Sequence, residues 1–355
     1  MYELKISWAN SRAHPVKSST AKRPAACLAS LLLLLLAFSA SPMQAQTAPA
    51  AATTAAARGE TVQFQSKLVG KTLPYNVLLP PDYASQAALT TRYPVLYLLH
   101  GLSGHYADWL AKTKLSSYAA QHRLIIVTPE GNNGWYTDSA TNPPDKYETY
   151  IMRELIPDVQ KRFRTIESRE GRAIAGLSMG GYGALKFGMK FPDQFVFAAS
   201  MSGALAAASW TEADLRKGGA FAIPSITAVF GAADNPTHAA NDIFKLVREF
   251  PTVPLSSLPY FYLDCGTEDS LLRYSRTLAD IFLERKIPHE YRELPGKHNW
   301  IFWDAQVRDV LRIAGERMSP PQKEIKTTRL EPTPRAGTLR LARTERRGLT
   351  AHIGD

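Results

Sequence analysis

From residue 94 onward, short runs of apolar residues alternate with longer segments in which apolar residues recur at helical spacing. Short and continuously apolar runs are typical of strands that are buried on both faces of a sheet. A chain that alternates such strands with helices is expected to form the α/β class, with a mostly parallel central sheet and helices on both faces. The predicted strands are residues 94–99, 124–127, 172–175, 195–199, 259–263 and 289–294, and the predicted helices are 106–120, 147–163, 180–190, 270–286 and 303–318.

Three further features modify this regular pattern. Residues 61–67 and 73–79 are predicted as two earlier strands, the second of which ends at a pair of prolines. Pro157 predicts a break or kink in the helix over 147–163. Residues 204–258 form a long connection between two core strands. Because such insertions commonly shape the mouth of a pocket, we expect this segment to form part of the substrate wall.

The N-terminal residues 1–45 have the pattern of a secretory signal peptide. Five Lys and Arg residues precede an apolar run over 27–40, and a small, polar stretch follows it. The run is too short to cross about 30 Å of hydrocarbon, so we predict a signal cleaved near Ala45 and no stable membrane span afterwards. Residues 46–59 are predicted to be a flexible leader. The mature protein is therefore expected to be periplasmic or secreted.

The two ends of the chain carry most of its positive charge. The whole sequence has 42 Lys and Arg against 32 Asp and Glu, whereas residues 47–318 have 29 against 27. Residues 319–355 are basic, contain proline and show no apolar period, so they are predicted to be a disordered tail. Nucleic-acid binding has no support from the near-neutral remainder, because it requires a clustered basic face.

Length and cysteine usage limit the chemistry further. Residues 60–318 are long enough for one catalytic domain with a single core. Cys27 lies in the predicted signal, so Cys265 is the one cysteine left after cleavage and no intramolecular disulfide can form. A Cys/His metal site lacks its ligands for the same reason.

Residues 176–180 read Gly-Leu-Ser-Met-Gly and match the G-x-S-x-G motif. A bare match is weak, but this one follows an apolar strand and opens a predicted helix, which is the context of a nucleophile elbow. Ser178 would then stand at the sheet edge above a helix N-terminus, where the dipole favours negative charge. We therefore predict Ser178 as a nucleophile, with a Gly/Ser helix cap as the alternative.

A serine hydroxyl is a weak nucleophile unless a base takes its proton. On this type of sheet the serine is followed along the chain by an acid and then by a histidine. His298 lies in the loop between the last predicted strand and the last predicted helix, so it is the predicted base. His289 begins a strand, where a solvated histidine is more common.

The acid is expected after the strand over 259–263, where three carboxylates compete. Asp264 lies at the end of that strand and is expected to point into the turn. Asp269 lies beyond Gly266 and just before a helix, and it is the preferred acid, while Glu268 and Asp264 stay open. Each could instead cap the helix that begins near Ser270.

Two N–H donors are needed to stabilise the oxyanion that forms during acyl transfer. The backbone N–H of Met179, directly after the nucleophile, is the first predicted donor. The second is expected from the loop His100-Gly101-Leu102-Ser103-Gly104, and we predict the N–H of Leu102. His100 is expected to be structural.

Several blocks of the sequence together resemble one known family. They are residues 98–104 with Trp109, residues 134–138, residues 147–149 with 154–157, residues 176–183, residues 265–269, and residues 298–300 with Trp303. The chain resembles the esterase-D-like α/β-hydrolases, which include bacterial acyl esterases, feruloyl and acetylxylan esterases, S-formylglutathione hydrolases and, more distantly, mycolyltransferases. The resemblance spans roughly residues 60–318.

This resemblance implies a triad of Ser178, Asp269 and His298, with no metal and no cofactor. It also implies that Trp135 and Tyr136 lie near the acyl or leaving-group pocket; a place in the core is the alternative for Trp135. The expected activity is hydrolysis of short-acyl or aryl esters, including acetyl and feruloyl esters, with a small-molecule or carbohydrate-linked ester as substrate. The alternatives are acyl transfer to a carbohydrate alcohol and an S-formylglutathione hydrolase-like thioesterase, although the signal peptide argues against the second. The sequence leaves the oligomeric state undetermined.

Overall fold

A sheet of eight strands runs through the part of the chain that this computed structural model describes, residues 57–216, 219–250 and 257–323. Its strands lie in the order β1-β2-β5-β4-β6-β7-β8-β9. β2 pairs antiparallel with β1 and with β5, and the strands from β5 to β9 are parallel to one another. Their bounds are β1 Arg58–Val62, β2 Tyr75–Leu79, β4 Val95–Leu99, β5 Ile125–Pro129, β6 Arg172–Leu177, β7 Phe197–Met201, β8 Tyr260–Gly266 and β9 His289–Leu294.

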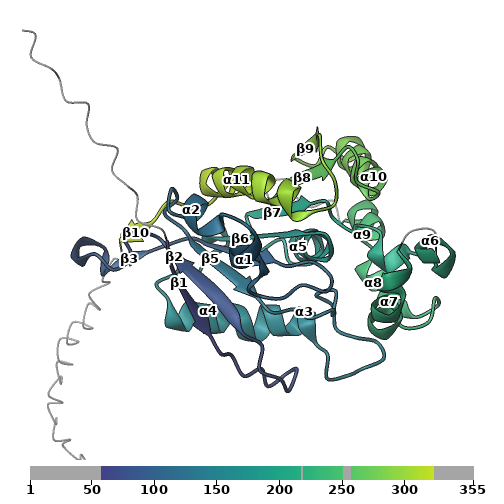
Figure 1. The fold of residues 1–355 in the computed structure, drawn as a ribbon, viewed down its shortest axis with the longest axis horizontal. Coiled ribbons are helices and arrows are strands. Elements are labelled where there is room, and N and C mark those ends of the chain that lie inside the picture. Colours follow the sequence, from purple (N-terminus) through teal and green to yellow (C-terminus); the bar gives the residue numbers. More distant parts are fainter. Residues whose placement is uncertain (1–56, 217–218, 251–256, 324–355) are drawn as a thin grey trace, which may run out of the picture. The chain divides into compact units, whose positions relative to one another are not determined.

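Helices cover both faces of this sheet, as Figure 1 shows, and the predicted α/β class is confirmed. The α-helices are α1 Asp108–Lys112, α2 Leu115–Ala119, α3 Tyr147–Tyr150, α4 Ile156–Arg162, α5 Met179–Lys190, α6 Glu212–Arg216, α7 Ile223–Phe230, α8 Pro236–Asn241, α9 Ile243–Glu249, α10 Leu272–Glu284 and α11 Trp300–Arg317. Short 3₁₀ turns occur at Gln86–Ala88, Arg169–Gly171, Ala207–Ser209 and Ala220–Ala222. A small second sheet pairs β3, Thr91–Arg92, with β10, Gln322–Lys323.

The core consists of two apolar layers, one on each face of the sheet. Side chains alternate along each strand, so Leu96 and Leu98 of β4 pack in the layer under α1, α2 and α11. Val95, Tyr97 and Leu99 of the same strand pack in the layer shared with α4, α5 and α10. Every residue of β4, β5, β6 and β7 is buried, which explains why these strands are mostly apolar in the sequence.

Two predicted helices are interrupted. The segment 106–120 forms two short helices, α1 and α2, with Thr113 extended between them. The segment 147–163 contains a π-helical turn over Ile151–Leu155, between α3 and α4. Pro157 is the second residue after this turn, and in a regular α-helix its ring would clash with the carbonyl group four residues earlier. The wider π turn is the break that Pro157 predicted.

Two boundaries near the C-terminal half also differ from the prediction. β8 continues to Gly266, three residues beyond the predicted strand end. α11 begins at Trp300, three residues before the predicted start at 303. The earlier start has a local cause, because the side chain of Asn299 accepts a hydrogen bond from the N–H of Phe302 at 3.1 Å and caps the helix.

The ordered domain extends beyond the predicted span of 60–318 at both ends. β1 begins at Arg58, inside the predicted leader, and Ala57 is buried. At the other end, Gln322 and Lys323 of the predicted tail pair with β3. The predicted signal peptide, the rest of the leader and the tail from residue 324 lie outside the described residues. Among the helices in the described ranges, none is long and apolar enough to cross a membrane.

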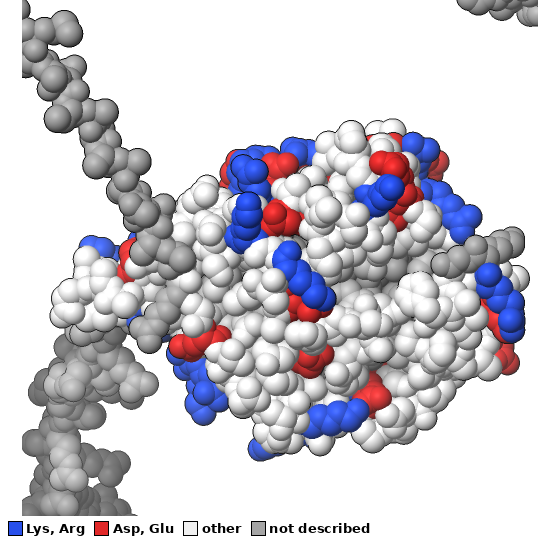
Figure 2. Space-filling view, viewed as in Figure 1, with Lys and Arg blue, Asp and Glu red and all other residues white. Residues whose placement is uncertain are grey.

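On the face shown in Figure 2, Lys and Arg side chains alternate with Asp and Glu side chains, and wide uncharged areas separate them. No continuous basic area is visible on the described part of this face. The charge distribution seen here agrees with the near-neutral composition of the domain.

Candidate active site

Ser178 lies on the sharp turn between β6 and α5. Its backbone has φ 52° and ψ −116°, a conformation that is rarely adopted by a residue other than glycine. The turn is possible because strand and helix pack very closely: a Cβ on Gly176 would lie 2.4 Å from the backbone of Gly180. The geometry is that of a nucleophile elbow, with Ser178 raised at the carboxyl edge of the sheet.

His298 and Asp269 complete a hydrogen-bonded chain that begins at Ser178. Nε2 of His298 is 3.0 Å from Oγ of Ser178, and Nδ1 is 2.8 Å from Oδ2 of Asp269. A carboxylate can only accept, so Nδ1 carries the proton and Nε2 is left free to accept from the serine hydroxyl. The edge-on contact of Trp303 with the imidazole, at 4.9 Å between ring centroids, supports the ring from the side.

Asp269 is suited to remain ionised. Burial alone would raise its pKa, but hydrogen bonds from His298 and from the N–H of Leu271 outweigh burial, and the pKa lies below its usual value. The side chain is fully buried, whereas that of His298 is 34% exposed. A buried anion beside a partly exposed imidazole is the arrangement that stabilises an imidazolium when it forms.

The two competing acids lie elsewhere. Glu268 is exposed and pairs with Lys297 at 3.6 Å. Asp264 was expected to point into the turn, but it does not, because β8 extends past it. Its position within the strand places it in the buried layer that also contains Tyr262. Burial raises the pKa of Asp264 well above its usual value.

Both predicted oxyanion donors flank the nucleophile. Met179 is buried and is the first residue of α5. Leu102 belongs to the loop after β4, which touches the elbow: a Cβ on Gly101 would lie 3.4 Å from Cβ of Ser178. Among the hydrogen bonds of the described residues, none uses the N–H of Leu102. This N–H group is therefore free to meet a developing negative charge.

Ser178 and His298 lie in a cavity of about 690 Å³. The insertion between β7 and β8 supplies a large part of its wall, as the length of that segment predicted. The residues that it contributes are Ala204, Trp210, Asp214, Leu215, Gly219, Phe221 and Ala222.

The wall formed by the insertion is aromatic, and Trp135 is its anchor. The Trp135 ring meets those of Tyr182 and Trp210 edge-on, with centroids 5.9 and 6.1 Å away, and its Nε1 donates to Ser225 at 3.0 Å. Tyr274 then contacts Trp210 at 5.9 Å. Trp135 therefore fits both readings of the sequence, because it lines the cavity and is 2% exposed.

Tyr136 differs from the expectation. It is fully buried and is not among the residues that line the cavity. Its hydroxyl group donates to the carbonyl of His100 at 3.1 Å. The backbone at Trp135 and Tyr136 is left-handed at both residues, with φ 50°, and this turn directs the second ring into the core.

Lys186 lies on α5 and is completely buried, and the sequence alone did not identify it as a site residue. Its ammonium group donates to the carbonyl of Tyr136 and to the hydroxyl of Thr137, both at 2.6 Å, and pairs with Glu148 at 2.8 Å. Burial lowers the pKa of Lys186, and Glu148 opposes that effect. In the sequence Lys186 resembles any polar residue of an amphipathic helix, so no local signal marked it.

A second part of the cavity wall combines charge with aromatic rings. Asp108 is buried and pairs with Lys112 at 2.9 Å, and the Lys112 ammonium lies 5.1 Å from the centroid of the Trp300 ring. Trp300 and Trp303 pack edge-on at 5.3 Å. The spacing of Asp108 and Lys112 could have suggested a pair on one helix face, but not its place beside the cavity. Within the described ranges, no group of three His, Cys, Asp or Glu residues could hold a metal ion.

The elbow, the hydrogen-bonded chain and the strand order together define an α/β-hydrolase fold. The model of the family described as "Putative esterase" matches residues 66–312, and the chain belongs to this family. The resemblance predicted from the sequence blocks is thereby confirmed at the family level.

Individual relatives agree with this assignment. An esterase of Mycobacterium tuberculosis is 33% identical over 253 residues, which are 66% of this chain and 54% of the relative. This chain thus spans about half the length of that relative. An acetyl esterase of Caldicellulosiruptor saccharolyticus is 30% identical over 251 residues, covering 69% of this chain and 94% of the relative. The solved structure of a ferulic acid esterase has a TM-score of 0.62 at 26% identity, over 74% of this chain and 99% of that one.

Proposed function

We propose that this chain is an exported serine carboxylesterase that forms an acyl-enzyme on Ser178. The observation that carries the proposal is the chain of hydrogen bonds Asp269–His298–Ser178 in the cavity, at 2.8 and 3.0 Å. A nucleophile, a base and an orienting acid in this order are the parts that acyl transfer requires. The names of the relatives, an acetyl esterase and a ferulic acid esterase, support an ester as the substrate.

In the first half of the reaction, Oγ of Ser178 attacks the ester carbonyl while Nε2 of His298 takes the hydroxyl proton. The carbonyl electrons move to oxygen, and the N–H groups of Leu102 and Met179 stabilise that oxyanion. His298 then gives its proton to the departing alcohol. In the second half, His298 activates a water molecule, which releases the acid and restores the serine. Asp269 stays ionised throughout and stabilises the imidazolium.

The lining of the cavity favours esters with a short-acyl or an aryl group. Trp135, Trp210 and Tyr274 line the cavity, and aromatic rings bind planar aromatic groups through favourable edge and stacking contacts. The acetyl and feruloyl esters named in the relatives fall in this range. We therefore propose aryl esters, with feruloyl as the representative, and acetyl esters as substrates.

The proposal is tested by assaying the purified protein on p-nitrophenyl esters from acetyl to long acyl and on methyl ferulate. Ser178→Ala is expected to abolish turnover, because no other activated nucleophile replaces Oγ. Ser319→Ala, two residues beyond the end of α11, is the matched control and is expected to keep full activity. Retention of full activity by Ser178→Ala would refute the mechanism. Failure of the folded wild-type protein to cleave any of these esters would refute the activity.

Product analysis separates hydrolysis from transfer. The same assay is run with and without an added sugar alcohol, and the free acid and the sugar ester are quantified. We expect free acid in both cases. A sugar ester as the main product would assign the protein to the acyltransferases. Export is tested separately, by N-terminal sequencing of the protein recovered from the periplasm or the medium, where a start near Gln46 is expected.

A further inference from the structure

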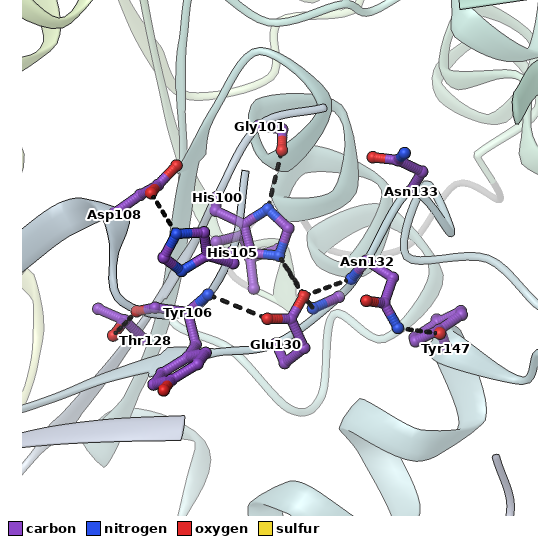
Figure 3. Close-up of polar contacts among 12 residues, drawn as sticks. His100, Gly101, His105, Tyr106, Asp108, Thr128, Glu130, Asn132, Asn133 and Tyr147 are labelled. Atoms are coloured by element: carbon purple, nitrogen blue, oxygen red, sulfur yellow. Dashed lines mark hydrogen bonds and ion pairs between the residues drawn. The ribbon is translucent and has the colours of Figure 1, made fainter. Parts of the chain in front are cut away.

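Two buried side chains lie directly behind the loop that carries Leu102, and the mechanism above does not use them. His100 is 1% exposed and directly follows β4. Glu130 is 7% exposed and directly follows β5. Figure 3 shows them facing each other, with Nε2 of His100 3.3 Å from Oε1 of Glu130. Burying a carboxylate is costly unless it is paired and hydrogen-bonded, so the partners of this pair are informative.

His100 holds one particular carbonyl group. Its Nδ1 lies 2.8 Å from the carbonyl oxygen of Gly101. A carbonyl can only accept, so Nδ1 carries the proton and donates it. On the other side of the ring, the N–H of Gly131 donates to Nε2 at 2.9 Å. The imidazole is therefore fixed from both sides, between the loop after β4 and the loop after β5.

The carbonyl that His100 holds belongs to the same peptide unit as the N–H of Leu102. In a trans peptide the C=O and the following N–H lie in one plane and point in opposite directions. A bond that fixes the oxygen of Gly101 toward the protein interior therefore directs the N–H of Leu102 the other way. Gly101 also touches the elbow, since a Cβ placed on it would lie 3.4 Å from Cβ of Ser178.

Glu130 fastens the two loops to each other. Its Oε1 accepts from the N–H groups of Gly131 at 3.1 Å and Asn132 at 2.7 Å, and its Oε2 accepts from the N–H of Tyr106 at 3.2 Å. Burial would raise its pKa, but the N–H groups of Asn132 and Tyr106 oppose that effect, and the pKa lies below its usual value. An ionised carboxylate that accepts several N–H bonds is among the strongest anchors available to a loop.

The tip of the Leu102 loop has its own fastening. The N–H of Ser103 donates to Oδ1 of Asn133 at 2.8 Å, and Ser103 has a left-handed backbone with φ 60°. The peptide units on both sides of Leu102 are thus tied to the loop that begins at Glu130. Leu102 itself contributes no hydrogen bond among the described residues, and its N–H stays available.

We propose that His100 and Glu130 are positioning residues, which fix the N–H of Leu102 as an oxyanion donor in the reaction proposed above. His100 acts on the Gly101–Leu102 peptide directly, and Glu130 acts by clamping the loop that supports His100. The two side chains do not touch the substrate. Their effect is expected in the transition state, where the oxyanion exists, and not in the binding of the neutral ester.

The experiment measures kcat, KM and the affinity for an aryl trifluoromethyl ketone in the full-length protein. Oγ of Ser178 adds to the ketone carbon, the carbonyl electrons move to oxygen, and the proton passes to His298, so the adduct carries an oxyanion. His100→Ala is expected to lower kcat about tenfold to a hundredfold, to leave KM within about twofold, and to weaken the ketone by a similar factor. Glu130→Gln is expected to lower kcat about tenfold, because an amide can accept at only one of the two oxygen positions.

Conservative variants separate orientation from packing. The side-chain amide of Asn can donate from a position near Nδ1, so His100→Asn is expected to regain part of the lost kcat. Gln reaches further, toward the position of Nε2, so His100→Gln is expected to regain none. A merely structural histidine would show no such order between the two.

Two matched controls lie away from the cavity. Glu154 accepts from the N–H groups of Lys67 and Leu68 at 2.9 and 3.1 Å, so Glu154→Gln repeats the chemical change of Glu130→Gln at a distant loop. Nδ1 of His289 lies 2.9 Å from the carbonyl of Ile287, so His289→Ala repeats the change at His100. Both controls are expected to keep kcat, whatever they do to the melting temperature.

The proposal is overturned if His100→Ala and Glu130→Gln lose no more kcat than their controls, or if the loss lies in KM with unchanged affinity for the ketone. If the wild-type protein cleaves no ester, the proposed function fails by itself. The rate at which a fluorophosphonate labels Ser178 then still decides the inference, because phosphonylation also builds negative charge on the oxygen that faces Leu102. Equal labelling rates in wild type and His100→Ala would reject the positioning role.

Discussion

The two sides of the cavity are held together by different forces. On the side of the Leu102 loop, individual peptide units are fixed by hydrogen bonds to the side chains of His100, Glu130 and Asn133, at 2.7–3.2 Å. On the side of the insertion, Trp135, Trp210 and Tyr274 are held mainly by edge-on ring contacts at 5.9–6.1 Å between centroids. The first kind of contact is directional, and the second depends mostly on buried area.

The difference shows which side of the cavity requires accurate positioning of its atoms. An oxyanion donor is effective only when it lies within hydrogen-bond distance of one atom, so the loop that carries it needs directional bonds. A wall that accepts an acyl group needs shape and apolar area, and it tolerates changes in side-chain detail. Substitutions on the polar side should therefore change rate, and those on the aromatic side should change preference among substrates.

The largest effect is expected at the acid of the triad. Asp269→Asn should lower kcat by about 10⁴-fold, because the amide can hold the imidazole in the wrong tautomer. Esterase kinetics on p-nitrophenyl acetate measure this effect. Glu268→Gln, one residue away and exposed, is the control and should leave kcat unchanged. A large loss in Glu268→Gln with none in Asp269→Asn would contradict the assignment.

Behind the aromatic wall, the buried Lys186 donates hydrogen bonds to Tyr136 and Thr137, which directly follow Trp135. Lys186→Met should reduce the free energy of unfolding by about 3 kcal/mol, because it leaves buried partners of the ammonium group without their donor. Urea denaturation followed by tryptophan fluorescence measures the change. Lys190→Met is the matched control, since Lys190 pairs with the same Glu148 but is 24% exposed, and it should cost much less. Equal losses in both variants would show that burial of the pair is unimportant.

On the aromatic side, Trp210→Ala should lower kcat/KM for methyl ferulate about tenfold and should leave the value for an acetyl ester within about twofold. The ring contacts of Trp210 with Trp135 and Tyr274 are lost, and with them the surface that binds an aryl group. Leu283→Ala on α10 is the control, because this side chain is 72% exposed and does not line the cavity. A uniform loss for both esters in Trp210→Ala would argue against a role in selectivity.

Lowering the pH should also distinguish the two sides of the cavity, through a smaller effect on the free energy of unfolding. The pKa of Glu130 is lower in the folded state than its usual 4.5, so the ionised group stabilises the fold above that pH, and the contribution is lost as the pH falls through the folded value. The difference in unfolding free energy between wild type and Glu130→Gln should therefore shrink as the pH falls below about 4.5. The difference between wild type and Trp210→Ala should stay constant, because the lost contacts carry no titrating group. Urea melts at a series of pH values test both expectations.

Much of the site was predictable because its residues follow the ends of parallel strands that come in the same order along the chain and across the sheet. Ser178 and His298 follow the ends of β6 and β9, and parallel strands bring those ends to one edge of the sheet. The acid stayed ambiguous for a local reason. Asp264 and Asp269 differ in role because β8 continues to Gly266, and the apolar pattern could not show where that strand ends.

Other residues could not be found in the sequence because their partners come from separate strands. His100 and Glu130 meet because β4 pairs with β5 in a particular register, from Val95 opposite Ile125 to Tyr97 opposite Val127. That register is a property of the folded sheet, since neither segment alone contains it. Tyr136 was placed near the pocket by resemblance, whereas two successive left-handed residues turn its ring inward. Lys186 needed Tyr136, Thr137 and Glu148 to be assembled around it before it became recognisable.

The insertion that supplies the aromatic wall leaves the sheet after Met201 and returns at Tyr260, the start of the neighbouring strand. Its two attachment points are therefore adjacent, and the strands that carry the nucleophile and the base lie outside it. A segment with this anchoring can be exchanged between related enzymes as a single cassette, while the catalytic machinery keeps its geometry. For laboratory recombination, residues 205–259 mark the unit to transplant when a different acyl preference is wanted, because the N–H of Ala204 donates to the carbonyl of Ser178 at 3.0 Å and belongs with the elbow.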